Sequence, residues 1–263
     1  QIEEEHRFSH DLDAVEIPAV APVSIDGKTL HHHQGYMFTL FPSIGGRQYE
    51  IDNLDQMEWV GRFLGRIHQV GSENLFTHRP TMDLTEYLTE PREVLAGSVL
   101  IPAKQRSAFL SILDELITTI KEYWHHDWQP RRLHGDCHPG NILWRDGPIF
   151  VDLDDARNGP AVQDLWMLLH GERSEQLIQL DILLEAYGEF ADFDSRELAL
   201  IEPLRAMRMV YYLAWVTRRW QDPAFPNSFP WMKDEDFWRG QAAAFKEQIN
   251  KLRAPPLQLM PMY

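Results

Sequence analysis

Cysteine, positive charge and long apolar runs are all scarce in this sequence. The single cysteine, Cys137, excludes an internal disulfide framework and favours a reducing compartment. Lys and Arg total 25 against 40 Asp and Glu, and a net charge of −15 argues against a nucleic-acid or membrane-surface protein. No apolar run approaches the roughly 18 residues of a membrane helix, and no signal-peptide pattern opens the chain. We therefore predict neither a membrane span nor a signal peptide.

What the chain does contain is enough apolar sequence for a substantial core. Of its 263 residues 44% are hydrophobic, which is ordinary for one large or two modest globular domains. The first residue is Gln1 rather than methionine, and it lies directly inside a charged helical pattern. We therefore expect the natural chain to begin upstream of it.

Two regions differ in their periodicity, and we place the boundary between them at residue 44. Residues 1–44 combine a short helical segment at 2–12, an Asp26-Gly27 hairpin turn and a strand at 35–41. Residues 45–263 follow a helical period in the segments 54–67, 109–120, 177–187, 204–220 and 234–252. The helical region is interrupted by a short β-hairpin at 141–153, with Asp146-Gly147 as its turn. The pattern predicts an α+β protein, with a strand-rich fragment joined to a mostly helical domain.

The densest polar cluster brackets that hairpin, with the sequence HGDCHPGN at 134–141 before it and VDLDD at 151–155 after it. The hairpin should bring Asn141 and Asp152 close together. Two carboxylates about 5 Å apart repel by roughly 3 kcal/mol at an effective dielectric near 20, so the acidic cluster favours a bound cation. Oxygen ligands that include an Asn point to Mg²⁺ or Ca²⁺ rather than zinc. The bland alternative is an ordinary exposed turn, in which Asp, Asn, Gly and Pro also gather.

The order of these residues is more specific than their composition. His-x-Asp, an Asn five residues after the Asp, and a strand that ends in apolar-Asp make up a phosphotransfer arrangement. In this arrangement the first acid, Asp136, orients the acceptor hydroxyl. Asn141 and Asp152 would hold the metal.

The segment 134–143 followed by Val151-Asp152 resembles the catalytic segment of the aminoglycoside phosphotransferase and choline kinase group, which shares the protein-kinase fold. The resemblance implies a two-lobed fold with a partial β-rich N-lobe, Asp136 as catalytic base, and Asn141 and Asp152 as Mg²⁺ ligands. It further implies ATP-binding and supporting residues. Leu40, Phe41 and Ser43 would form an interlobe hinge at the adenine, and Leu143 and Val151 would line the adenine site. His134 and Asp164 would support the loop. Glu5, or Glu4 in its place, would pair with a phosphate-binding lysine.

The chain also departs from the family pattern. No Gly-rich loop followed by a strand lysine is present in it, so we expect Glu5 to be a solvated charge. His134-Gly135 is the small-molecule-kinase form of the motif, whereas the sequence from Asp155 to Trp166 is similar to a bacterial branch of cytoplasmic Ser/Thr protein kinases of the stress response.

Three functions therefore stay open: a Ser/Thr protein kinase of the stress response, a small-molecule hydroxyl kinase, and a non-catalytic binding module. The first two imply ATP and a protein or small hydroxyl acceptor as partners. We expect a cytoplasmic monomer that binds neither nucleic acid nor membrane.

Other conspicuous residues are better explained by structural roles. We expect the histidines 31–33 in an exposed hairpin strand, Cys137 as a small residue that fills a loop position, and His138 as a brace of the loop. Arg205 and Arg208 lie on the most apolar helix of the chain, so we expect Glu202 or an active-site acid nearby as a partner, and a role that faces the substrate stays open for them.

Overall fold

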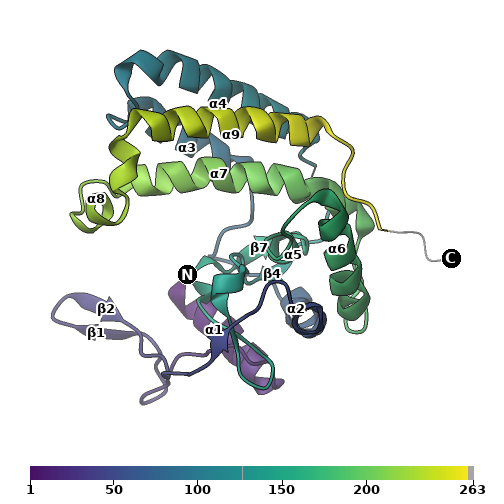
Figure 1. Ribbon diagram of the computed structural model, residues 1–263. Coiled ribbons are helices and arrows are strands. Elements are labelled where there is room, and N and C mark those ends of the chain that lie inside the picture. Colours follow the sequence, from purple (N-terminus) through teal and green to yellow (C-terminus); the bar gives the residue numbers. More distant parts are fainter. Residues whose placement is uncertain (126, 260–263) are drawn as a thin grey trace. The chain divides into compact units, whose positions relative to one another are not determined.

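The computed structural model describes residues 1–125 and 127–259 (Figure 1). It is mixed α+β, as predicted, with long helices and small antiparallel sheets. The chain forms two compact units. One comprises Gln1–Met82, Asp127–Glu197 and residues 257–259, and the other comprises residues 83–125 and Leu198–Pro256. The lobe boundary at residue 44 stays a prediction.

The first unit holds every described strand and the catalytic segment. Its three sheets are small: β1 (His31–His33) pairs with β2 (Tyr36–Phe38), β5 (Ile142–Trp144) lies between β3 (Arg47–Gln48) and β6 (Pro148–Phe150), and β4 (Arg131–Leu133) pairs with β7 (Arg157–Gly159). All of these pairs are antiparallel. The longer helices of this unit are α1 (Ile2–Ala14), α2 (Leu54–Glu73) and α6 (Arg173–Tyr187), and the single-turn helix α5 spans Gln163–Trp166.

Helix α2 shows how sequence and packing agree. Asn53 caps its start by accepting the backbone N–H of Gln56 at 3.2 Å. The predicted apolar stripe is buried at Met57, Val60, Leu64 and Ile67. Gly65 lets α6 approach closely, because a Cβ there would lie 2.6 Å from the carbonyl oxygen of Tyr187. This approach brings the end of α6 beside the buried face of α2.

The second unit is helical. Its elements are the π-helix η1 (Thr85–Thr89), α3 (Glu90–Gly97), α4 (Ala103–Tyr123), α7 (Ile201–Arg218), α8 (Ala224–Ser228), the 3₁₀ turn η5 (Pro230–Lys233) and α9 (Glu235–Arg253). Helix α4 packs on α9 and α3 packs on α7. The buried ring of Phe109 lies 5.2 Å from that of Trp238 and 5.6 Å from that of Phe245, measured between centroids. This aromatic contact joins α4 to α9.

Both predicted hairpin turns are confirmed. Asp26 and Gly27 have φ angles of 52° and 75°, and Asp146 and Gly147 have φ angles of 60° and 148°. Such left-handed residues are what tight hairpin turns require. Strand β3 was not predicted, because only two residues form it and they carry no alternating pattern.

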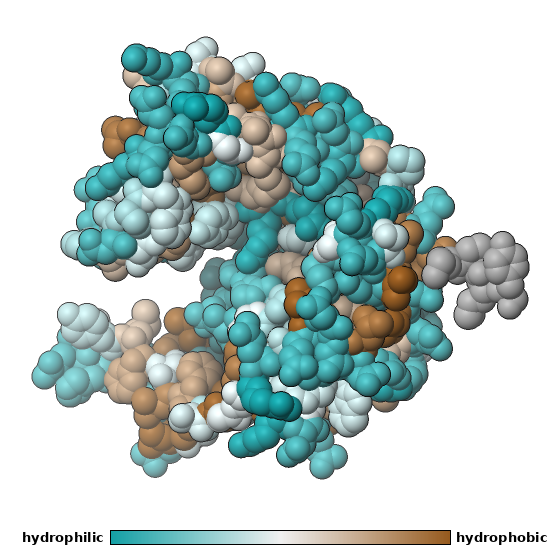
Figure 2. All heavy atoms as spheres, in the orientation of Figure 1, coloured by the Kyte–Doolittle hydropathy of each residue, from teal (hydrophilic) through white to brown (hydrophobic). Residues whose placement is uncertain are grey.

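The β1–β2 hairpin is exposed, and in Figure 2 its tip is hydrophilic while apolar side chains gather toward its base. Strand β2 spans only Tyr36–Phe38 and is shorter than the predicted strand at 35–41. Its side chains are solvated, with Tyr36, Met37 and Phe38 exposed at 77%, 61% and 41%. The three histidines of β1 lie on the partner strand, as expected of an exposed hairpin. Within the described part of the chain, no helix is both long and apolar enough to cross a membrane.

Candidate active site

The loop from His134 to Asn141 leaves β4 and enters β5, and its first residues are anchored by a buried acid. The backbone N–H groups of His134 and Gly135 donate to the two carboxylate oxygens of Asp164, each at 2.8 Å. Gln163 adds a third anchor by donating to the Gly135 carbonyl at 2.8 Å. Asp164 is fully buried in α5. The bracing geometry that the family resemblance implies for Asp164 is therefore present.

Asp164 is the end of a buried hydrogen-bond chain. His68 on α2 lies between it and Tyr187 on α6, with Nε2 at 3.0 Å from Asp164 Oδ2 and Nδ1 at 3.0 Å from the Tyr187 hydroxyl. Arg131 donates to the same hydroxyl at 2.9 Å. The arrangement is consistent if Tyr187 donates to Nδ1 and the Nε2–H of His68 donates to Asp164.

The charges of this chain follow from its burial. Burial lowers the pKa of His68, although Asp164 opposes the shift, so the ring is neutral. Burial by itself would raise the pKa of Asp164, but the hydrogen bonds from His68 and from the backbone N–H of Gly135 lower it. One buried negative charge, surrounded by donors, therefore holds the start of the catalytic loop.

Gly135 is required by the close approach of the segment that carries Asp152. Its φ is +88°, a left-handed conformation that a side chain disfavours. A Cβ at this position would lie 2.1 Å from the backbone oxygen of Asp155. This explains in physical terms why glycine, rather than a larger residue, stands between His134 and Asp136.

The predicted catalytic and metal residues are drawn together by backbone contacts. The His134 Nε2–H donates to the Val151 carbonyl at 2.9 Å, and the Val151 N–H donates to the Asn141 carbonyl at 3.0 Å. Asn141 Nδ2 donates to the backbone oxygen of Asp136 at 3.0 Å. That donation leaves the Oδ1 of Asn141 as the atom that can ligate a cation.

His138 and Cys137 have the structural roles predicted for them. His138 Nδ1 accepts the Gly140 N–H at 2.9 Å, and its Nε2 lies 3.5 Å from Asp136 Oδ2. Cys137 is fully buried, and burial raises the pKa of its thiol well above the usual value. The thiol is therefore inert at neutral pH. In the second unit, Arg205 Nε lies 3.4 Å from Glu202 Oε2, and Glu202 is one of the two partners expected for it.

Asp152 has two features that suit a cation ligand. Its backbone is left-handed, with φ 63° and ψ 66°, a strained conformation for a non-glycine residue and one that clusters at functional sites. Partial burial raises the pKa of its carboxyl, and the charges of Asp154, Asp155 and Asp136 raise it further. A cation beside Asp152 would relieve this repulsion.

The donor set fits magnesium better than a transition metal. Among the described residues, no three His, Cys, Asp or Glu side chains meet as a ready-made metal site. One amide oxygen and one or two carboxylates suit Mg²⁺, which keeps several waters and takes further oxygens from phosphates. These residues therefore have the chemistry of a site that is completed by a metal–nucleotide complex.

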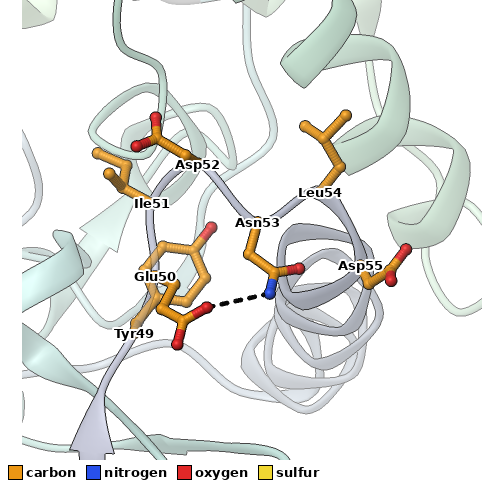
Figure 3. Close-up of a pocket in the computed structure, with 7 residues that line it drawn as sticks. All are labelled: Tyr49, Glu50, Ile51, Asp52, Asn53, Leu54 and Asp55. Atoms are coloured by element: carbon orange, nitrogen blue, oxygen red, sulfur yellow. Dashed lines mark hydrogen bonds between the residues drawn. The ribbon is translucent and has the colours of Figure 1, made fainter.

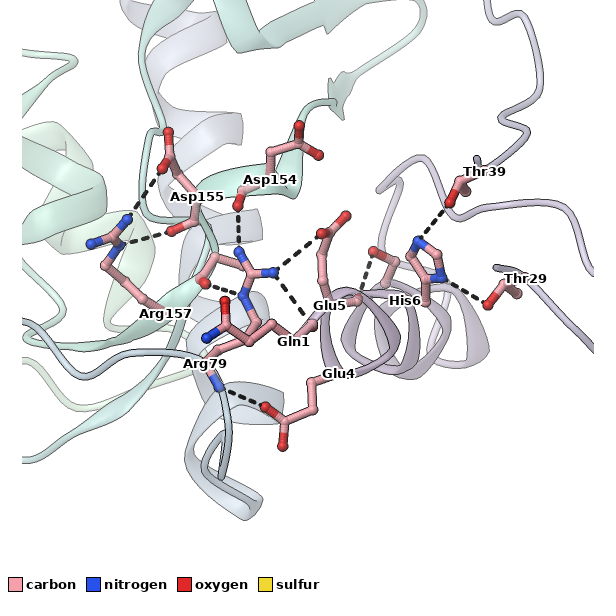
Figure 4. Close-up of polar contacts among 12 residues, drawn as sticks. Gln1, Glu4, Glu5, His6, Thr29, Thr39, Arg79, Asp154, Asp155 and Arg157 are labelled. Atoms are coloured by element: carbon pink, nitrogen blue, oxygen red, sulfur yellow. Dashed lines mark hydrogen bonds and ion pairs between the residues drawn. The ribbon is translucent and has the colours of Figure 1, made fainter. Parts of the chain in front are cut away.

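The prediction that Glu5 is a solvated charge is wrong. Glu5 on α1 is only 5% exposed, and its carboxylate accepts from Nη1 of Arg79 at 3.3 Å (Figure 4). Burial raises the pKa of Glu5 to about 7, with Arg79 opposing the rise and Asp154 and Asp152 adding to it. Sequence reasoning failed here because Arg79 lies 74 residues away and belongs to no motif.

The residues expected to contact adenine lie in two places in the first unit. Leu40 and Phe41 are 45% and 48% exposed and Ser43 is also exposed, in the connection that follows β2. Leu143 lies in β5 opposite Ile149, and Val151 follows β6. Leu143 also pairs with Gln48 of β3, a strand that begins four residues after Ser43.

A pocket of about 810 Å³ lies where β3 leads into α2 (Figure 3). Seven consecutive residues line it, and none of the predicted site residues is among them: Tyr49, Glu50, Ile51, Asp52, Asn53, Leu54 and Asp55. Asp52 accepts from His170 at 2.9 Å, and Asn53 donates to Glu50 at 3.2 Å (Figure 3). Its acids are thus partly engaged with their neighbours.

Sequence reasoning missed His68, Arg79, Gln163 and Tyr187. His68 lies on the apolar face of α2, four residues after Leu64, where a polar residue among buried positions was the available signal. Gln163 directly precedes Asp164. The contacts of Arg79 and Tyr187 depend on tertiary packing, and no local pattern marks them.

Comparison with known proteins agrees with this geometry. Residues 1–201 match the model of the phosphotransferase enzyme family. The chain is 60% identical over 263 residues to stress response kinase A of Escherichia coli strain K12. The alignment covers all of this chain and 80% of that protein. It is 59% identical, with the same coverage, to the serine/threonine protein kinase RdoA of Salmonella typhimurium strain LT2.

Solved structures resemble it at much lower sequence identity. Amicoumacin kinase hAmiN, in complex with AMP-PNP, Ca²⁺ and Ami, superposes with a TM-score of 0.71 at 20% identity, over 98% of this chain and 78% of that one. A microcompartment-associated aminopropanol kinase gives a TM-score of 0.68 at 16% identity, over 98% and 83% of the two chains. These likenesses show the fold.

Fold and catalytic segment together define a phosphotransferase enzyme with the kinase-like fold of the aminoglycoside kinases. The expectations of an α+β kinase fold and of a kinase activity are confirmed. The chain belongs to the phosphotransferase enzyme family.

Proposed function

We propose that this protein is a Mg²⁺- and ATP-dependent Ser/Thr protein kinase that acts in the stress response, as a cytoplasmic monomer. The observation that carries the proposal is the 60% identity, along the whole chain, to a relative named stress response kinase A. A second relative is named a serine/threonine protein kinase. The arrangement of the loop 134–141 beside Asp152 supports the same chemistry.

Asp136 acts as general base. Its carboxylate accepts the proton of the acceptor hydroxyl while that oxygen forms a bond to the γ-phosphorus, and the bond from phosphorus to the β,γ-bridging oxygen breaks to release ADP. A positioned base contributes on the order of 10²–10⁴ in rate. Asp164, through His134 and Gly135, holds the backbone that carries this base.

Asn141 and Asp152 hold the metal ion through Oδ1 and the carboxylate. When bound, Mg²⁺ neutralises charge on the terminal phosphates of ATP. Leu143 and Val151 line the adenine site, and Leu40, Phe41 and Ser43 form the hinge beside it. His134 keeps Val151, and with it Asp152, close to the catalytic loop through its 2.9 Å hydrogen bond.

A small-molecule hydroxyl kinase is the second candidate. Two of the structures it resembles are described as kinases of amicoumacin and of aminopropanol, which are small molecules. Gly135 belongs to the small-molecule form of the motif. Its left-handed backbone and its close approach to the Asp155 carbonyl explain why a glycine stands at this position. The nature of the acceptor therefore has to be decided by assay.

The test is phosphoryl transfer by the whole natural protein. Protein acceptors rich in Ser and Thr, and separately amino alcohols, are incubated with it, Mg²⁺ and labelled ATP. We expect label on protein, a loss of about 10²–10⁴ in turnover for Asp136→Asn, and nucleotide binding close to that of the wild type. Label on the amino alcohols alone would favour the second candidate.

The matched control is Asp146→Asn. Asp146 is exposed at the hairpin turn ten residues further on, and Asn tolerates its left-handed backbone. The control should keep wild-type turnover. Near-normal turnover in Asp136→Asn would show that Asp136 is not the base.

A further inference from the structure

Arg79 connects three parts of the first unit that are far apart in the sequence. It lies in the connection after α2, and its side chain is 8% exposed. Its Nε donates to the backbone oxygen of Ala156, its Nη2 to that of Asp154, and its Nη1 to the carboxylate of Glu5 on α1 (Figure 4). One guanidinium thus joins helix α1 to the turn that directly follows Asp152.

The backbone around Arg79 is held from both sides. Glu4 on α1 accepts the N–H groups of Thr77 and His78, each at 2.9 Å, and that of Arg79 at 2.8 Å. Burial opposes ionisation of this carboxyl, but the backbone donors lower the pKa of Glu4 to about 2. Glu4 is therefore a fixed negative charge at neutral pH.

On the other side, the connection after Arg79 is tied to β7. The N–H of Asn158 donates to the Pro80 carbonyl at 3.0 Å, and the N–H of Met82 donates to the Asn158 carbonyl at 2.8 Å. Residues 77–82 therefore form a strap between α1 and the segment 153–158. Among the described residues of this strap, only Arg79 has a side chain that hydrogen-bonds both to α1 and to the segment 153–158.

We propose that Arg79 is a positioning residue for phosphoryl transfer, because its guanidinium group holds the turn that follows Asp152 against helix α1. The effect of Arg79 on phosphoryl transfer rests on the proposed function, whereas its effect on the turn does not. The planar guanidinium suits this role because it presents several donors in a rigid fork, and a lysine cannot reach three acceptors at once. Arg79 acts through the backbone that carries Asp152 and contacts no substrate in this role.

The first measurement is independent of catalysis. Amide hydrogen exchange at residues 153–158 is followed in the whole natural protein without metal or nucleotide. Arg79→Met should speed exchange there by about tenfold or more, because the turn loses its side-chain donors. Arg79→Lys should give an intermediate increase, and it serves as the test if the Met variant does not fold.

The second measurement separates positioning from general damage. In steady-state kinetics, Arg79→Met should raise the Mg²⁺ concentration for half-maximal activity, and the KM for Mg·ATP, by about tenfold or more, since a ligand displaced by about 1 Å binds poorly. The KM for the acceptor should stay within about twofold. A merely structural loss would lower the active fraction and leave both KM values in place.

Arg132→Met is the matched control. Arg132 is also a buried arginine that pairs with an acid of α1, at 2.8 Å from Asp11, and it lies 4.6 Å above the ring of Phe8. The backbone of Arg132 pairs with Asn158 in the β4–β7 sheet, but its side chain donates to Asp11 and to the Val70 carbonyl and makes no hydrogen bond to residues 153–158. This variant should destabilise the protein while leaving exchange at 153–158 and the Mg²⁺ dependence at wild-type values.

Unchanged exchange at 153–158 in Arg79→Met and Arg79→Lys, or equal changes in Arg132→Met, would overturn the proposal. A wild-type protein that transfers no phosphoryl group would instead contradict the proposed function. In that case the exchange experiment still decides whether Arg79 fixes the turn. The two failures are therefore distinguishable.

Discussion

The catalytic segment and the β1–β2 hairpin are built in opposite ways. In the catalytic segment polar groups are buried and paired: Asp164 is fully buried and accepts from two backbone N–H groups and from His68. In the hairpin, apolar groups are exposed, with Tyr36 at 77% and Met37 at 61%. Buried polar networks have strict geometry because an unpaired member is costly, whereas an exposed apolar residue imposes little order. The catalytic segment is therefore where single changes should have large effects.

The largest effect on stability should come from Asp164→Asn. The substituted amide would turn an NH₂ group towards donors that now bond to a carboxylate. We expect the free energy of unfolding to fall by about 3–5 kcal/mol, as for a broken buried pair. Urea unfolding measures it. The control is Asp114→Asn, which breaks an exposed pair with Arg92 at 2.9 Å and should cost no more than about 1 kcal/mol. Equal losses in the two variants would contradict the comparison.

A smaller, pH-dependent effect should come from Glu197. It is 1% exposed and accepts the Val162 N–H at 3.0 Å, next to the helix that carries Asp164. Burial raises its pKa to about 7, although the Val162 N–H and Arg131 lower it. The folded state therefore binds more protons than the unfolded state between pH 4.5 and about 7, and stability falls as the pH rises through that window.

Replacing Glu197 with Gln should remove this dependence. The amide oxygen can still accept the Val162 N–H, and no charge has to be buried. Between pH 5 and pH 8 the wild type should lose on the order of 2–3 kcal/mol more than Glu197→Gln. Thermal unfolding across that range measures the difference. Parallel curves for the two proteins would show that Glu197 ionises normally in the folded state.

The smallest effect should come from the hairpin. Met37→Ala removes an exposed side chain and should change the free energy of unfolding by less than about 0.5 kcal/mol. Met57→Ala, in the buried face of α2, should cost about 2–5 kcal/mol by leaving a cavity. Chemical denaturation of both variants makes the comparison. A loss above 1 kcal/mol at Met37 would mean that the hairpin packs more tightly than its exposure indicates.

Local patterns were sufficient wherever one segment determines its own structure. The apolar stripe of α2, the two Asp-Gly turns and the clustering of Asp136, Asn141 and Asp152 around one hairpin all follow from residues close in sequence. Long-range pairing escaped that reasoning. Glu5 was expected in solvent and is instead buried against Arg79. Strand β3 formed from two residues because β5 was available beside it.

The order of residues along the chain determined that this protein has a short catalytic segment of phosphotransferase type, because spacing within one loop and hairpin is a local property. Only the folded structure decided how that segment is held. The bonds that join His68 to Asp164 and to Tyr187, and those that join Arg79 to Glu5 and to the turn after Asp152, link residues that lie between 74 and 119 positions apart. Such contacts depend on how helices pack, and helix packing depends on the whole core rather than on any one motif.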